Sequence, residues 1–123
     1  MLQAYSLNVT VPAGSSVPFN NVTLKKGCTA VLNGVSTIEL NKCGVYMIAF
    51  DSSSSAAVTL QAYKDGVALP QAQAAGNSPS FITLVTATDN NTCCSMPTTV
   101  TVKNTGTANA VLTDCNIVVT KVC

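Results

Sequence analysis

The amino-acid sequence predicts an all-β fold, arranged as a two-sheet sandwich or jelly roll. Apolar residues recur at a spacing of two along nearly the whole chain, and β-branched Val, Thr and Ile dominate these segments. No segment keeps the spacing of about 3.6 residues that marks an amphipathic helix. Turn residues separate about ten short segments of this kind, which is the pattern of a β-sandwich.

Residues 45–50, Val-Tyr-Met-Ile-Ala-Phe, are predicted to form the central strand. All of them are apolar, whereas a strand with one wet face alternates apolar and polar residues. Gly44 before this stretch and the serine run 52–55 after it limit it to the length of a strand. We therefore expect both faces of this strand to be covered.

The other strands are predicted from alternation, and turn residues set their ends. Asn33-Gly34 and Asp65-Gly66 suit tight hairpins, because these residue types tolerate a positive φ. The serine run and residues 74–79 are predicted to be loops, and residues 89–97 form the longest irregular stretch. The remaining predicted strands are residues 7–11, 19–24, 30–32, 35–40, 56–64, 67–72, 81–87, 98–103, 110–113 and 116–122.

Length and charge limit the kinds of protein that this chain can be. Its 123 residues predict a single domain, 1–123, with enough volume for a hydrophobic core. The net charge of +1 gives no basic footprint for nucleic acid. Charged residues make up only 9% of the chain, so we expect partners to cover much of its surface.

The N-terminal residues 1–8 have neither the basic nor the apolar region of a signal peptide. No run of residues approaches the ~18 apolar residues of a membrane-spanning helix. We therefore expect synthesis in the cytosol without a cleaved signal, and no membrane span.

Six cysteines are many for a cytosolic chain of this size, which suggests a protein made inside a cell that works outside it, such as a virion component. They can form disulfides or remain buried thiols that pack as small apolar residues. A zinc or iron–sulfur site at Cys93-Cys94 is disfavoured, because paired zinc ligands are usually about two to four residues apart. The disulfide candidates are Cys28, Cys43, Cys93, Cys94, Cys115 and Cys123.

The composition also argues against catalysis. The chain has no histidine, which removes Ser–His and Cys–His nucleophile pairs and His-containing metal sites. Its five acidic residues are scattered along the sequence. We therefore predict no enzyme activity, no catalytic or metal-binding residues and no cofactor.

Three segments resemble the jelly rolls of the complement globular-head and tumour-necrosis-factor (TNF) family. Residues 38–48 are similar to that family's pair of strands in which an apolar strand leads to a Gly-x-Tyr, here Gly44 and Tyr46. Residues 58–67 resemble its hairpin, which ends in an Asn-Gly or Asp-Gly turn, and residues 114–122 resemble its closing strand. The order of the three segments along the chain also matches.

This resemblance implies a TNF-like jelly roll of ten strands in two sheets, assembled as a homotrimer around a threefold axis. One face of the central strand would pack between the sheets and the other toward a neighbouring subunit. Tyr46, Ile48 and Phe50 share one of these faces and are the trimer-interface or core candidates. Tyr46→Asp or Ile48→Asp is therefore expected to break assembly at least as readily as folding.

The short form without a signal or a collagen-like stalk is similar to small bacteriophage proteins. This implies a non-enzymatic structural protein of the virion surface, a trimeric head-decoration or head-fibre module made in the cytoplasm of the bacterial host. Its partners would be its own copies and the major capsid protein or another virion protein. The alternative is a receptor- or glycan-binding tip of a phage fibre, in which residues 52–55, 74–79 and 89–97 would bind a host-surface glycan.

Overall fold

The structure is a computed structural model that describes residues 1–27, 29–87 and 98–122. Within these residues the chain forms ten β-strands. Their bounds are β1 Leu2–Val11, β2 Asn21–Lys25, β3 Ala30–Asn33, β4 Thr37–Leu40, β5 Gly44–Ser54, β6 Val58–Lys64, β7 Val67–Gly76, β8 Ser80–Ala87, β9 Thr98–Asn104 and β10 Ala110–Lys121. No helix long and apolar enough to cross a membrane occurs in the described ranges.

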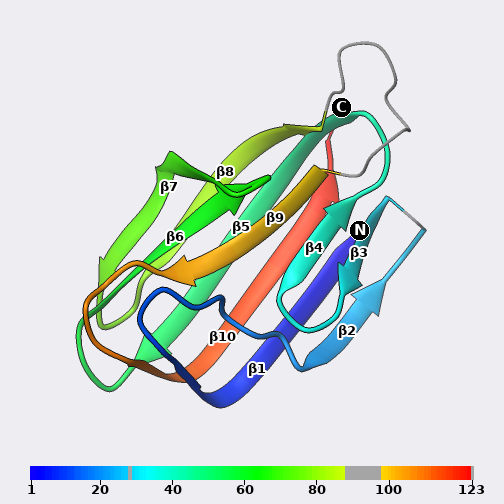
Figure 1. The fold of residues 1–123 in the computed structure, drawn as a ribbon. Coiled ribbons are helices and arrows are strands. Elements are labelled where there is room, and N and C mark those ends of the chain that lie inside the picture. The colour runs from blue at the N-terminus through cyan, green and yellow to red at the C-terminus, as the bar shows by residue number, and fades with distance from the viewer. Residues whose placement is uncertain (28, 88–97, 123) are drawn as a thin grey trace.

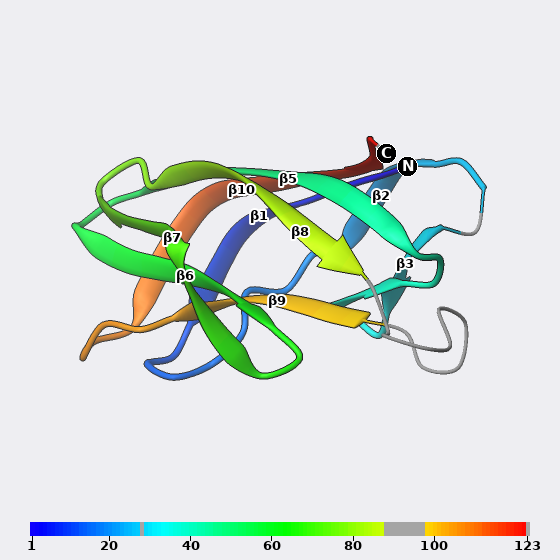
Figure 2. The same ribbon diagram turned by 90° about the horizontal axis from the view of Figure 1, so that it is seen from above.

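The strands form two five-stranded antiparallel sheets that lie face to face (Figures 1 and 2). The first sheet has the order β2-β1-β10-β5-β8, and the second has the order β3-β4-β9-β6-β7. Inward-facing residues of the strands other than β2 fill the space between the sheets, where they form one continuous apolar core, while all residues of β2 are exposed. The largest fully buried side chains are Tyr46, Phe19, Phe50, Leu2, Ile38, Leu40, Ile48, Leu60, Leu112, Ile117, Val11 and Val17.

Strand β5 contains the predicted apolar strand but is longer than predicted. It lies between β10 and β8, so it is an interior strand, while β10 occupies the middle of the first sheet. The prediction that residues 52–55 form a loop is wrong for 52–54, because pairing with β10 continues through Ser52 opposite Cys115. Ser52 is buried, and its hydroxyl donates a hydrogen bond of 2.7 Å to the Pro79 carbonyl, which lets a polar residue enter the core.

The first strand is also different from its prediction. Alternation placed Leu7 and Val11 on one face, but Leu7 is 58% exposed while Val11 is buried. Asn8 lies between them and has a φ of 54°. Before Asn8 the even-numbered residues face the core, and after it the odd-numbered residues do. The structure therefore buries Leu2 and Ala4, which precede the predicted strand.

The two predicted segments 110–113 and 116–122 are one strand, β10. Its register with β5 shifts between Leu112 and Asp114, which is a β-bulge. At the bulge, the residues that face the core change from even-numbered to odd-numbered, but the strand continues. This explains why alternation alone indicated two strands. Strand β10 pairs with β1 on one side and β5 on the other.

The tight turn at Asp65-Gly66 is confirmed, with φ values of 50° and 82°. Strand β7, which follows it, runs on to Gly76 and takes in part of the predicted loop 74–79. Gly34 has a φ of 74° and lies in the turn between β3 and β4. Residues 89–97 lie outside the described residues.

The structure gives different outcomes for the six cysteines that were predicted as disulfide candidates. Cys115 was a disulfide candidate, and this is wrong: it is a free thiol. Its side chain is buried between the sheets, with Sγ 3.9 Å from the Pro18 carbonyl oxygen, where it packs as a small apolar residue. Cys43 is disulfide-bonded. The candidates Cys28, Cys93, Cys94 and Cys123 lie outside the described residues.

Candidate subunit interface

The outward face of the first sheet carries large apolar side chains that the protomer leaves exposed. Ile82 and Leu84 on β8 are 71% and 60% exposed. They alternate with Phe81, Thr83 and Val85, which are buried. Strand β8 thus carries large apolar residues on both of its faces, although it lies at the edge of the sheet.

Strand pairing aligns outward-facing residues, some exposed and some half-buried, into a row across the whole sheet. Leu24 lies opposite Gln3, Gln3 opposite Val118, Val118 opposite Ala49, and Ala49 opposite Ile82. Side chains of directly opposed residues lie on the same face of a sheet. This face therefore presents a band of apolar side chains, which Gln3 interrupts.

The neighbouring rows differ in polarity. On one side of the band, Met47 lies between Thr120 and Leu84. On the other side, Asp51 lies between Asn116 and Ser80. We use the term apolar face for Val45, Met47, Ala49, Ile82, Leu84 and Val118.

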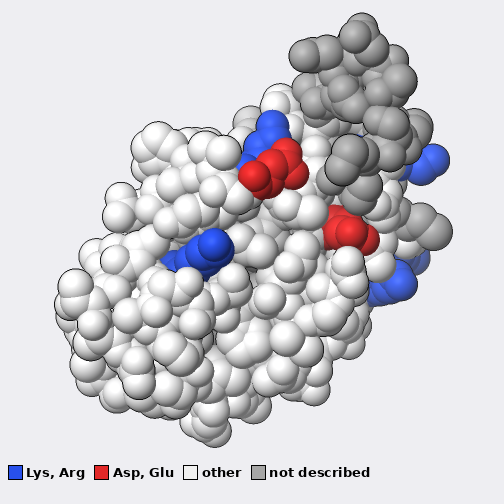
Figure 3. All heavy atoms as spheres, viewed as in Figure 1, with Lys and Arg blue, Asp and Glu red and all other residues white. Residues whose placement is uncertain are grey.

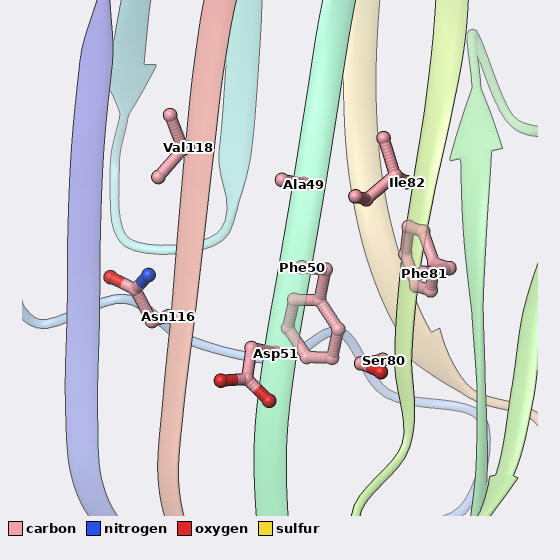
Figure 4. A pocket seen from close by; sticks show the side chains of 8 residues that line it. All are labelled: Ala49, Phe50, Asp51, Ser80, Phe81, Ile82, Asn116 and Val118. Carbon is pink, nitrogen blue, oxygen red and sulfur yellow. The ribbon is translucent and has the colours of Figure 1, made fainter.

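The apolar and polar rows meet at an open hollow of about 600 Å³. Figure 4 shows Val118, Ala49 and Ile82 at one level of the hollow and Asn116, Asp51 and Ser80 at the level below. Phe50 and Phe81 also line it, and their rings stack with centroids 5.2 Å apart. The hollow can accept an apolar side chain of a partner beside a polar rim.

The sequence-predicted residues Tyr46, Ile48 and Phe50 lie on the opposite side of β5. Their exposed fractions are 0%, 0% and 1%, so they belong to the core of the protomer. The Tyr46 hydroxyl donates a hydrogen bond of 2.8 Å to the Lys42 carbonyl, and burial raises the pKa of this side chain. The face left for a neighbouring subunit is that of Val45, Met47 and Ala49, which are half-buried.

Sequence reasoning missed the contribution of β8 to this face. The signal was present in residues 81–87, where Ile82 and Leu84 interrupt what would otherwise be an alternation of buried and polar positions. An apolar residue at an outward position is common on protein surfaces. Ile82 and Leu84 form part of an apolar patch only because strand pairing places them beside Ala49 and Met47, which the sequence does not show.

The outer face of the second sheet is more polar, with Thr59 and Gln61 on β6 and Thr101 and Lys103 on β9. Figure 3 shows this side of the molecule, with a few charged side chains over one part and a broad uncharged area over the rest. Lys103 and Tyr63 pair here, with Nζ 4.8 Å from the ring centroid. Among the described residues, no group of three or more Cys, Asp or Glu side chains is placed to hold a metal ion.

The sequence matches no protein-family model and no curated protein. The structure is similar to the globular domain of zebrafish complement 1qA protein, with a TM-score of 0.78 and 12% identity over 99% of this chain and 96% of that chain. It is similar to the PRD1 vertex protein P5, with a TM-score of 0.67 and 13% identity over 99% of this chain and 96% of that chain. Murine APRIL matches with a TM-score of 0.62 and 12% identity over 98% of both chains.

These likenesses cover almost the whole chain, and their low identities limit what they show to the fold. The ten strands in two sheets match the architecture that the resemblance implied. The predicted fold class is therefore confirmed: the chain is a TNF-like, complement C1q-like jelly roll of two five-stranded sheets.

Proposed function

We propose that this chain is a non-enzymatic structural protein of a bacteriophage virion, and that it forms a trimeric head-decoration or head-fibre module on the capsid surface. The observation that carries this proposal is the outward apolar face of the first sheet, on which Ile82 and Leu84 are mostly exposed. The shared fold with a vertex protein of PRD1 supports the virion as its place of action. Its partners are its own copies and the major capsid protein or another virion protein.

The apolar face supports self-association on energetic grounds. Burying apolar surface contributes roughly 25 cal/mol per Å², and a large aliphatic side chain contributes about 1.5–3 kcal/mol when it is fully buried. Ile82 and Leu84 gain little of this in the protomer, because they are mostly exposed. Contiguous apolar patches on monomers are usually small, and larger ones mark sites of association.

A threefold arrangement is supported by the different edges of the first sheet. A cyclic trimer needs a heterologous contact, in which one patch of a protomer meets a different patch of the next. Strand β8 ends the sheet on one side with Ile82 and Leu84, and β2 ends it on the other with Leu24. The two edges thus present different exposed apolar side chains, so each protomer can contact two neighbours through different patches.

The assembly is tested by mass measurement under non-denaturing conditions. The unmodified chain should be a trimer, and the double variant Ile82→Lys, Leu84→Lys should be a folded monomer. Val67→Lys is a matched control, because Val67 is 67% exposed but lies on β7 of the second sheet. A monomeric parent chain, or a double variant that stays trimeric, would contradict the proposal.

The location on the virion needs a separate experiment. Phage particles grown with an epitope-tagged chain should carry the tag on the head, and the chain should remain bound to purified capsids through a wash in moderate salt. A tag found at the end of a tail fibre, together with binding to a glycan array, would favour the receptor- or glycan-binding tip instead. That alternative has lost one of its loops, since residues 52–54 belong to β5.

A further inference from the structure

The one Asn-Gly pair of the sequence, Asn33-Gly34, lies where β3 ends and the turn to β4 begins: Asn33 is the last residue of β3, paired with Thr37, and Gly34 is the first residue of the turn. We propose that Asn33 is a self-modifying site, at which the folded protein converts the side-chain amide to a carboxylate with water as the co-reactant. The proposal is independent of the assembly described above. It rests on the chemistry of this dipeptide and on the environment that the fold gives it.

The reaction has two balanced steps. The backbone nitrogen of Gly34 attacks Cγ of Asn33, an N–C bond forms, and the Cγ–Nδ2 bond breaks as Nδ2 leaves as ammonia. Water then adds to either carbonyl of the resulting five-membered imide and opens it. One opening gives an ordinary aspartate at this position, and the other gives iso-aspartate, in which the chain runs through the former side chain. Neither step transfers an electron, so no oxidant or reductant is needed.

The fold leaves room for this ring to form. Asn33 and Gly34 are both exposed, and a Cβ placed at Gly34 would meet no heavy atom within 4 Å. Gly34 has no side chain to shield its own nitrogen, and its φ of 74° favours glycine at this position. The side-chain amide of Asn33 is held only at the surface, where Nδ2 donates a hydrogen bond of 3.2 Å to Glu39.

Two other Asp and Asn side chains, Asp65 and Asn104, are fixed by hydrogen bonds that disfavour this reaction. Asp65 also precedes a glycine, but its Oδ1 accepts a hydrogen bond of 2.9 Å from the Thr99 backbone nitrogen, which fixes the carboxyl group against β9. Asn104 is buried, and its Nδ2 donates hydrogen bonds to the Val11 and Ala108 carbonyls at 3.0 and 2.9 Å. Of these three residues, Asn33 alone combines an exposed side-chain amide with a following glycine.

The modification would change the corner of the sandwich that holds Phe19. The backbone nitrogen of Phe19 donates a hydrogen bond of 2.6 Å to the Val35 carbonyl, inside the same turn. Gly34, Val35 and Phe19 also line an apolar hollow of about 310 Å³ beside β2. Iso-aspartate lengthens the main chain by one carbon in this turn, and either product places a carboxylate beside Glu39. Both changes weaken the anchoring of Phe19.

The test follows the purified, folded chain at physiological temperature, at mildly acidic and mildly alkaline pH. After reduction and trypsin digestion, the peptide 27–42 should convert to two products that carry the mass of a carboxylate, and isoaspartyl methyltransferase should label one of them. Conversion should be several times faster at alkaline pH, because the attacking nitrogen must lose its proton. The matched variant Asn33→Gln should stay unmodified, since its longer side chain disfavours the ring.

The result that would overturn the proposal is a peptide 27–42 that stays intact in the folded chain but converts after unfolding in urea. Fragmentation that places the modification at Asn41 instead of Asn33 would also overturn it. For the structural consequence, the modified chain is separated by ion exchange. Its midpoint of thermal unfolding should be lower than that of Asn33→Gln, and equal midpoints would contradict the loss of anchoring.

Discussion

Phe81 stacks on Phe50 across the β5–β8 pair, with ring centroids 5.2 Å apart and an interplanar angle of 24°. Phe19 approaches Phe50 edge-on, at 6.3 Å and 79°. The three rings connect the edge strand β8 to the segment before β2 through the centre of the core. The next residue along β8, Ile82, points to the opposite face.

Substituting Phe81 should therefore lower the stability of the protomer, whereas substituting its neighbour Ile82 should weaken assembly. Phe81→Ala should lower the free energy of unfolding of the protomer by about 3–5 kcal/mol, because it removes a buried ring and leaves a cavity. Ile82→Ala should change it by less than about 1 kcal/mol and weaken assembly instead. Denaturant unfolding and sedimentation of both variants check this. Equal losses of stability would contradict the assignment of the two faces.

The two faces of β5 should respond differently to a charge. Tyr46→Asp and Ile48→Asp place a carboxylate in the buried core, so both should unfold the protomer, and assembly is lost as a consequence. Met47→Asp lies on the half-buried outward face and should leave a folded chain that fails to assemble. Circular dichroism and native mass distinguish the outcomes. A folded Ile48→Asp protomer would contradict the burial of Ile48 between the two sheets.

Tyr46→Phe tests the hydrogen bonding of one hydroxyl in the same region, which also lies 3.4 Å from the Thr29 carbonyl oxygen. The hydroxyl donates to the Lys42 carbonyl at 2.8 Å and holds the segment that leads into β5. Its removal should cost on the order of 1 kcal/mol in the free energy of unfolding. Urea denaturation measures this, and a variant as stable as the parent chain would show that water replaces the bond without loss.

The stability of the chain should fall at alkaline pH because of Cys115. Burial raises the pKa of this thiol from 9.0 to about 11, while a hydrogen bond with the Ser6 backbone opposes the shift. The unfolded chain releases the thiol proton near pH 9 and the folded chain keeps it until about pH 11. The free energy of unfolding should therefore decrease between these values, by on the order of 1 kcal/mol per pH unit.

The control for this effect is Cys115→Ala. The variant loses some stability at every pH because a buried side chain is shortened, but the part of the pH slope that comes from the thiol should disappear. Denaturant unfolding of both chains at several pH values across the window gives the two slopes. The prediction fails if the slopes are equal.

Asn104 should be worth more to stability than its exposed neighbour Asn109. Its Nδ2 donates to the Val11 and Ala108 carbonyls, and its Oδ1 accepts a hydrogen bond of 2.9 Å from the Gly106 nitrogen. Asn104→Ala leaves the Val11 carbonyl without its partner in a buried place and removes two part-buried hydrogen bonds, so it should cost about 2–4 kcal/mol. Asn109→Ala should be nearly neutral, and thermal unfolding of the two variants measures the difference.

Much of the fold could be predicted from local pattern. The turn Asp65-Gly66 was predicted because its residues tolerate positive φ, and both adopt it. The strand at residues 81–87 matches β8, Ser80–Ala87, to within one residue. These features depend on the residues themselves and their immediate neighbours, so sequence contains the information needed to locate them.

Predictions failed where a distant partner or a local irregularity of the backbone decided the outcome. Ser52 extends β5 because β10 continues to pair with it and because the Pro79 carbonyl accepts its hydrogen bond. Leu7 is exposed because the chain changes parity at Asn8. From sequence alone, a run of serines is interpreted as a loop and an alternating segment as a regular strand. Only the packing of the two sheets shows that both interpretations are wrong here.

The sequence by itself determined that residues 45–50 form a strand with apolar residues on both faces, and it indicated the jelly roll that contains this strand. The tertiary structure decided which face is which. Tyr46, Ile48 and Phe50 face the second sheet, and Met47 and Ala49 lie in the apolar face beside Leu84 and Ile82. Alternation separates the two sides of a strand, but the side that meets the core depends on where the second sheet lies.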